Sequence, residues 1–108
     1  MYEYKARVVK IIDGDTIDFD VDLGFNITIR VRGRLLYVDT PERGHEDWKR
    51  ATQELNKLIL QERDSSGYVS VTTTKTGKYG RWLVEVGSIN KTLAEKWPYS
   101  TSKDEKRS

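Results

Sequence analysis

The first third of the chain alternates apolar and polar positions with the two-residue period of a half-buried β-strand. The clearest alternation begins at Thr16, where apolar side chains face one way and aspartates the other: Ile17, Phe19, Val21 and Leu23 against Asp18, Asp20 and Asp22. Residues 4–12 and 27–32 mix β-branched and charged residues in a similar way. We therefore expect three strands here, separated by a turn at "DGDT" and by a tight reversal at Gly24.

The second and third of these strands are expected to form an antiparallel hairpin. Pairing their apolar faces sets Asp18 opposite Arg30, a favourable cross-strand charge pair, and Gly33 opposite Asp15. A glycine at that position permits a β-bulge that bends the chain around the end of the sheet. The strict alternation also indicates that the aspartates of the second strand form a solvated face rather than a row of metal ligands.

The rest of the chain contains two helical patterns and two further strands. Within residues 46–62, apolar residues recur every three or four positions, which predicts the main helix, with Glu46 and Asp47 in its first turn. Residues 68–74 and 82–86 are strand-like. Ser88 is placed to cap a short helix that ends at Pro98.

This order of elements predicts an α+β protein that is mainly β. We expect a five-stranded OB-type barrel, with one main helix between strands 3 and 4 and a short C-terminal helix. OB barrels often bind nucleic acids, although a fold alone does not define a function. At 108 residues the chain has room for one domain, expected over residues 1–98, and the polar residues 99–108 are expected to form a disordered tail.

Composition adds modest constraints. The chain carries 19 Lys and Arg residues and 17 Asp and Glu residues, and this small basic excess leans toward polyanionic partners. It has no cysteine, which excludes disulfides and cysteine-type zinc sites. Because we see no signal peptide and no apolar run of membrane-spanning length, we expect a cytoplasmic protein without a membrane partner. The oligomeric state stays open.

Several charged residues have the chemistry of a metal and phosphate site. Asp15, Asp39 and Glu42 carry hard oxygen donors, whereas Arg34 and Arg81 carry planar cations that match phosphate oxygens. A chain that bends after the third strand brings Asp39 back toward the turn that holds Asp15. We therefore expect the two carboxylates to meet at one rim of the barrel, close to a divalent cation that prefers oxygen ligands.

Three motifs make a family resemblance specific: "IDGDT", "RLLYVDTPE" and "KYGRWLVEV". In order and approximate separation they are similar to those of the staphylococcal nuclease (thermonuclease) family, and the resemblance runs from about Val8 to Leu93. The chain looks like a short variant that lacks the family's C-terminal helix. The resemblance implies a calcium-dependent nuclease that hydrolyses phosphodiester bonds of DNA or RNA by metal-assisted in-line attack of water and leaves 3'-phosphates.

The same resemblance assigns roles by motif position. It implies that the calcium ligands are Asp15, Asp39 and the Thr40 carbonyl, that the catalytic residues are Arg34, Glu42 and Arg81, and that Lys78 and Tyr79 contact the substrate phosphate. Whether Glu42 acts as a general base or orients the attacking water stays open. The main alternative is a non-catalytic OB-fold module that binds nucleic acid or protein. The presence of the full catalytic set argues against it.

Other conspicuous residues are expected to have structural roles. Asp13 is interpreted as a turn residue, and His45 as a capping or surface residue. Tyr37 is expected to pack in the core or at its rim. Trp48 and Trp97 stand at helical spacing and are expected in the core.

Overall fold

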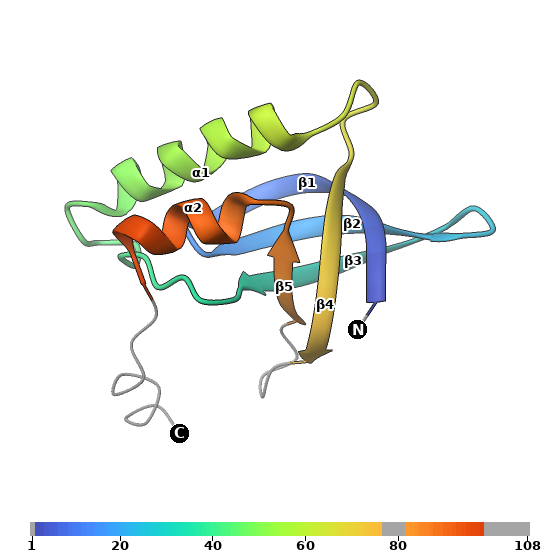
Figure 1. Cartoon of the computed structure of the whole chain (residues 1–108), viewed down its shortest axis with the longest axis horizontal. Coiled ribbons are helices and arrows are strands. Elements are labelled where there is room, and N and C mark those ends of the chain that lie inside the picture. Colours follow the sequence, from blue (N-terminus) through green and yellow to red (C-terminus); the bar gives the residue numbers. More distant parts are fainter. Residues whose placement is uncertain (1, 77–81, 99–108) are drawn as a thin grey trace.

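The computed structural model describes residues 2–76 and 82–98, which form a closed five-stranded barrel with two helices (Figure 1). In barrel order the strands are β1 (Tyr2–Asp13), β2 (Thr16–Gly24), β3 (Ile27–Leu35), β5 (Trp82–Val86) and β4 (Val69–Thr76). Helix α1 (Trp48–Glu62) joins β3 to β4, and α2 (Ile89–Lys96) follows β5. The predicted fold class is confirmed.

The described residues do not cover every sequence-based expectation. The polar tail predicted at residues 99–108 lies outside them. Within the two described ranges, neither helix is long and apolar enough to cross a membrane.

The core lies inside the barrel and beneath the two helices. Alternate residues of the strands point inward, and α1 adds one apolar stripe as it packs against β1 and α2. The buried apolar residues are Ala6, Ile17, Phe19, Val21, Val31, Leu35, Val38, Ala51, Leu55, Ile59, Val69, Val71, Val84, Val86, Ile89 and Leu93. Removing these side chains from water is the main force that closes the barrel.

The β2–β3 hairpin has a register different from the predicted one. Asp18 lies opposite Arg32 and Asp20 opposite Arg30, so the predicted pairing of Asp18 with Arg30 is wrong. The reason is the two-residue turn at residues 25–26, where both φ angles are positive (55° and 61°), together with a register shift between Asp22 and Gly24. Such a turn follows the right-handed twist of paired strands and thereby fixes which residues face each other. The hairpin projects beyond the rest of the barrel (Figure 1).

The corrected register still neutralises the charged face of the hairpin. Arg32 Nε donates to Asp18 Oδ1 at 2.8 Å, and Arg30 donates to Asp20 in the same way. The hydrogen bond from Arg32 lowers the pKa of the Asp18 carboxyl. Asp18 and Asp20 therefore each pair with an arginine of the neighbouring strand on the outward-facing side of the hairpin.

Gly33 has a packing role rather than the predicted bulge. It lies opposite Ile17, not Asp15, and the β2–β3 ladder has no register shift at this position. A Cβ atom on Gly33 would lie 2.9 Å from Cε2 of Phe19 and 3.1 Å from Cγ2 of Val84. The missing side chain therefore lets β3 pass close over the core between β2 and β5.

Helix α1 begins two residues later than predicted. The preceding loop forms consecutive turns, in which the His45 N–H donates to the Glu42 carbonyl at 3.0 Å and the Trp48 N–H donates to the His45 carbonyl at 3.1 Å. Asp47 is the N-cap residue, and its side chain makes no capping hydrogen bond. Glu46 and Asp47 thus precede the helix instead of occupying its first turn.

Ser88 occupies the N-cap position of α2 without capping it through its side chain. Its backbone N–H and its hydroxyl both donate to Oε1 of Glu62, at 2.7 and 3.2 Å. The residue therefore joins the end of α1 to the start of α2. The predicted helix start is confirmed, whereas the predicted side-chain cap is wrong.

Candidate active site

Asp15 and Arg34 are brought together by the paired ends of β2 and β3. Asp15 ends the turn that precedes β2, and Arg34 lies opposite Thr16 in the ladder. The pairing extends one step further, because the Leu35 N–H donates to the Asp15 carbonyl at 2.8 Å. Backbone hydrogen bonds alone therefore place the acid beside the arginine.

The segment after β3 returns Asp39 to the same rim. Val38 forms an isolated β-bridge with Pro98, and the Asp39 N–H donates to the Trp97 carbonyl at 2.9 Å. The end of α2 thus fixes the path of the segment that carries Asp39. This path explains why the apolar stretch before Asp39 is followed so closely by charges: Val38 packs in the core, and Asp39 lies at its edge.

The guanidinium group of Arg34 lies between the two acids. Its Nη2 is 3.5 Å from Asp15 Oδ2 and 3.5 Å from Asp39 Oδ1. Its Nη1 donates to the carbonyls of Leu35 and Val38, at 3.1 and 3.0 Å. The exposed fractions of these three side chains are only 12%, 9% and 6% for Arg34, Asp15 and Asp39. The two carboxylates therefore share one buried cation.

Burial raises the pKa of the Asp15 carboxyl above its ordinary value. The charge of Arg34 opposes this shift, as do the Thr40 N–H, which donates to Oδ2 at 3.1 Å, and the Thr16 hydroxyl, which donates to Oδ1 at 3.0 Å. Burial thus destabilises the ionised form of Asp15. A further positive charge near the carboxylate would stabilise that ionised form.

Thr40 adds a buried oxygen to the same place. Its hydroxyl Oγ1 has no hydrogen-bond partner, although the residue is buried. The side chain fits into a space that exists because Gly14 has none: a Cβ atom on Gly14 would lie 2.9 Å from Oγ1 and from Cγ2 of Thr40, and 2.9 Å from Cβ of Ala51. Among the described residues this buried hydroxyl has no partner, so it is a position at which a bound water or ligand gains a hydrogen bond.

These donors fit a hard divalent cation. Carboxylate, carbonyl and hydroxyl oxygens are the ligands that Ca²⁺ prefers, and Ca²⁺ completes its six to eight ligands with water or substrate oxygens. In residues 2–76 and 82–98, no group of three or more acidic, histidine or cysteine side chains is placed to hold a metal. An ion at this site would therefore depend on the Asp15 and Asp39 carboxylates, a Thr40 oxygen, and oxygens from outside the chain.

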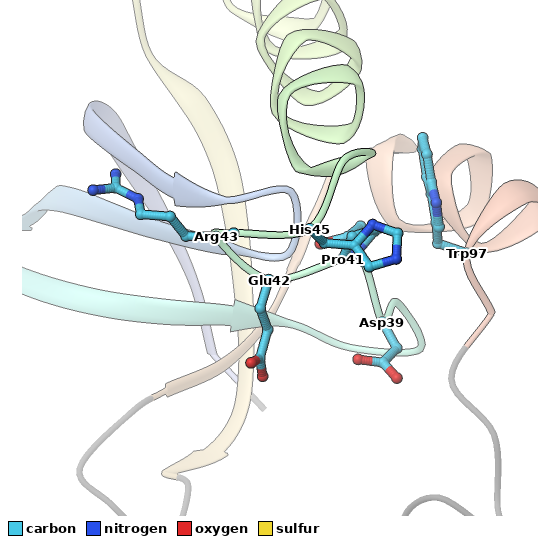
Figure 2. Close-up of a pocket in the computed structure, with 8 residues that line it drawn as sticks. Asp39, Pro41, Glu42, Arg43, His45 and Trp97 are labelled. Atoms are coloured by element: carbon cyan, nitrogen blue, oxygen red, sulfur yellow. The ribbon is translucent and has the colours of Figure 1, made fainter.

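A pocket of about 680 Å³ opens beside the acids, lined by residues 39–45 and Trp97. Figure 2 shows the carboxylates of Asp39 and Glu42 extending toward the same side, whereas Arg43 points away from them. Glu42 is exposed to solvent. The pocket therefore has the solvent-exposed carboxylate of Glu42 on the same side as the carboxylate of Asp39.

Asp13 and His45 organise the loop around this pocket. Asp13 Oδ1 accepts a hydrogen bond from the indole Nε1 of Trp48 at 2.8 Å, and the Arg43 guanidinium lies 5.0 Å from the centre of the same ring. His45 is exposed, and its Nδ1 accepts the backbone N–H of Asp47 at 3.0 Å. His45 has the surface role expected of it, whereas Asp13 ends β1 and its side chain binds Trp48 instead of shaping the turn. Trp48, expected in the core, is only half-buried because its indole reaches Asp13.

Tyr37 and Trp97 are less buried than predicted. Tyr37 is 63% exposed and has a φ of +68°, so the prediction that it packs in the core or at its rim is wrong. The chain reverses at this residue, and Val38 occupies the buried position instead. Trp97 packs against the core but stays half-buried, because its ring also lines the pocket.

Three predicted site residues, Lys78, Tyr79 and Arg81, lie outside the described residues. The next residue after Arg81 is described: Trp82 is paired with Gly33, which directly precedes Arg34. The roles of these three residues stay predictions.

Asn90 holds the site together although the sequence pattern does not single it out. Its side-chain Nδ2 donates to the carbonyls of Leu36 and Val84, both at 2.9 Å, and its Oδ1 accepts the Val86 N–H at 2.8 Å. The residue is 3% exposed. Its partners lie in other elements, and one is 54 positions away. An asparagine at a helix start therefore gives no local sign of this role.

Replacing Asn90 with leucine is expected to lower the free energy of unfolding by about 2–4 kcal/mol, because a buried N–H and a buried carbonyl lose their partners. Chemical unfolding in urea, followed by circular dichroism, measures the change. The neighbouring exposed Lys91→Ala is the control and should shift stability by less than about 0.5 kcal/mol. Equal stabilities of N90L and K91A would show that Asn90 does not clamp the end of β3.

The fold and the site define a small barrel with a buried centre of two aspartates and one arginine. No protein-family model matches the chain. The chain is similar to the micrococcal nuclease of Shigella flexneri, with 40% identity over 81 residues that make up 75% of this chain and 41% of that protein. It is also similar to the protein ParB of Escherichia coli, with 38% identity over 96 residues, or 89% of this chain and 48% of that protein. The chain thus spans less than half the length of these two curated relatives. Together with the five-stranded barrel, the first similarity supports a nuclease-like relationship.

Proposed function

We propose that this chain is a calcium-dependent nuclease that hydrolyses phosphodiester bonds in DNA, RNA or both by in-line attack of water and leaves 3'-phosphates. One observation carries the proposal: Arg34 lies 3.5 Å from both Asp15 and Asp39, and Asp39 lines a pocket together with Glu42. The similarity to micrococcal nuclease supports the same reaction class.

The carboxylates of Asp15 and Asp39, with the Thr40 carbonyl, would hold the calcium ion. When bound, calcium supplies positive charge that polarises a phosphate oxygen and orients a nucleophilic water. Such a charge favours the ionised form of Asp15, because burial raises the pKa of its carboxyl. The buried Thr40 hydroxyl without a hydrogen-bond partner fits the same role of oxygen donor.

Arg34 changes partners in this scheme. Without a second cation it neutralises both acids, while two backbone carbonyls hold its other edge. Once another cation neutralises Asp15 and Asp39, Nη2 of Arg34 can donate to a phosphate oxygen while Nη1 keeps its hydrogen bonds to the two backbone carbonyls. There it stabilises the negative charge that grows on the phosphorus oxygens in the transition state.

Glu42 and Arg81 complete the proposed set. The exposed carboxylate of Glu42 lines the pocket and extends toward the same side as that of Asp39 (Figure 2), and we propose that it accepts a proton or a hydrogen bond from the attacking water. Arg81 is proposed to donate to the phosphate near the leaving oxygen, and Lys78 and Tyr79 are proposed to contact the substrate phosphate. These three roles rest on the motif resemblance.

The proposal is tested by incubating the chain with single- and double-stranded DNA and RNA in calcium, in magnesium and in chelator, alongside Glu42→Gln and Arg81→Ala. We expect cutting that requires calcium and is lost in both variants. Polymers that stay intact under every condition, but still bind to the chain, would instead support the alternative of a non-catalytic nucleic-acid-binding module. Cutting that persists in chelator would contradict the proposed metal dependence.

A further inference from the structure

Trp97 forms an aromatic side of the pocket beside the proposed site. It is half-buried and directly follows α2, and its ring lines the pocket together with residues 39–45. Figure 2 shows the indole at one side of the pocket, across from Asp39, Pro41 and His45. A pocket with acids at one edge and a flat apolar ring at the other differs in chemistry from a site for a metal or a phosphate alone.

The backbone of Trp97 is fixed relative to Asp39. The Trp97 backbone N–H donates to the Leu93 carbonyl at 2.8 Å, and the Trp97 backbone carbonyl accepts the Asp39 N–H at 2.9 Å. Pro98 then pairs with Val38 in an isolated β-bridge. A ligand in contact with the ring therefore lies at a set distance from the proposed metal ligand, as a group covalently attached to the reacting phosphate would.

Two cations lie near the ring without covering it closely. The Arg50 guanidinium carbon is 5.9 Å and the Lys96 Nζ is 6.0 Å from the centre of the Trp97 ring. These distances are at the outer limit of cation–π attraction. The Arg50 side chain is 70% exposed and can move. Aromatic rings flanked by cations are the usual means of holding single strands, because bases stack on the ring while the cations pair with backbone phosphates.

The size of the pocket suits one nucleotide. Its volume of about 680 Å³ lies within the range of roughly 300–1,000 Å³ found for small-ligand sites. We propose that Trp97 is a substrate-contact residue whose indole stacks on one unpaired nucleobase of the polynucleotide, close to the phosphate that is cut. This inference rests on the proposed nuclease function for the identity of the ligand, whereas the stacking contact itself is testable without cleavage.

The test compares the wild-type chain with Trp97→Phe, which keeps an aromatic ring, and Trp97→Leu, which keeps apolar packing but loses the ring. The dissociation constant for a single-stranded DNA oligonucleotide is measured in chelator, and KM and kcat are measured in calcium. For W97L we expect both the dissociation constant and KM to rise about 5- to 100-fold, with kcat changed by less than about threefold. W97F should stay within about threefold of wild type. Binding of W97L indistinguishable from that of W97F would overturn the proposal.

A second measurement changes the ligand, and its deciding comparison uses the wild-type chain. Oligonucleotides that lack a single base are compared position by position in chelator, and removal of the stacked base should weaken binding about as much as W97L does. In W97L, removal of that base should cost nothing further, because the contact is already lost. If no abasic position weakens binding to the wild type, the proposal fails even where W97L does not fold. Failure of the nuclease function would appear differently, as intact substrate in calcium with the stacking contact still measurable.

Discussion

Glu42→Gln is expected to lower kcat for cleavage of single-stranded DNA in calcium by about 10²- to 10⁴-fold. The substitution keeps the shape of the side chain and removes the charge with which the carboxylate accepts a proton from the attacking water or orients it. Because Glu42 is exposed on the pocket rim, the loss should not come from unfolding. A continuous cleavage assay, with melting temperature as the check on folding, measures the effect.

Glu46→Gln is the matched control for this prediction. Glu46 is also exposed and lies in the same loop, but it does not line the pocket. The E46Q variant should cleave DNA at a rate within about twofold of wild type, because substitutions of exposed residues away from the core and the pocket have little effect. If E42Q and E46Q cleave equally well, Glu42 has no part in the chemistry.

Arg34→Ala is expected to destabilise the chain in chelator by about 3–5 kcal/mol. The change leaves the buried carboxylates of Asp15 and Asp39 close together without their shared cation, and removing one partner of a buried ion pair is costly. Calcium should restore part of this lost stability. The stabilisation by calcium should be larger in R34A than in the wild type, because in R34A the ion does not compete with a guanidinium for the two acids. Urea unfolding in chelator and in saturating calcium measures both effects.

Arg32→Ala provides the control, because it removes an arginine from the same strand. Arg32 pairs with Asp18 on the outer face, and its side chain is 51% exposed. Such a surface pair contributes about 0–1 kcal/mol, and its loss should leave the calcium response unchanged. An equal gain from calcium in R34A, R32A and wild type would show that Asp15 and Asp39 do not hold the ion.

Local patterns were sufficient to predict most of the fold. The alternation of Ile17, Phe19 and Val21 has only one buried arrangement on a strand, and the three- to four-residue spacing of Leu55 and Ile59 has only one on a helix. The errors occurred where backbone geometry decides. The turn at residues 25–26 and the register shift between Asp22 and Gly24 set the hairpin register, and consecutive turns before Trp48 delayed the start of α1.

Part of the candidate site could also be predicted from local sequence motifs. Asp15, Arg34 and Asp39 lie in motifs that resemble a known family, and the barrel brings them within contact. The roles of Trp97 and Asn90 were harder to predict, because they depend on partners far away in the sequence. The Trp97 carbonyl accepts the Asp39 N–H, and the Asn90 side chain donates to the Leu36 carbonyl. A tryptophan just before a proline at the end of a helix was the only local signal, and it indicates packing as readily as binding.

The central claim is that Asp15 and Asp39 together hold a calcium ion at the rim of the barrel. Calorimetric titration of Ca²⁺ into the wild-type chain and into Asp39→Asn, at neutral pH and without substrate, tests it most directly. We expect one binding site in the wild type and an affinity lower by roughly tenfold or more in D39N, because a charged ligand becomes a neutral one. Wild-type affinity in D39N, or no calcium binding by a folded wild-type chain, would contradict the account.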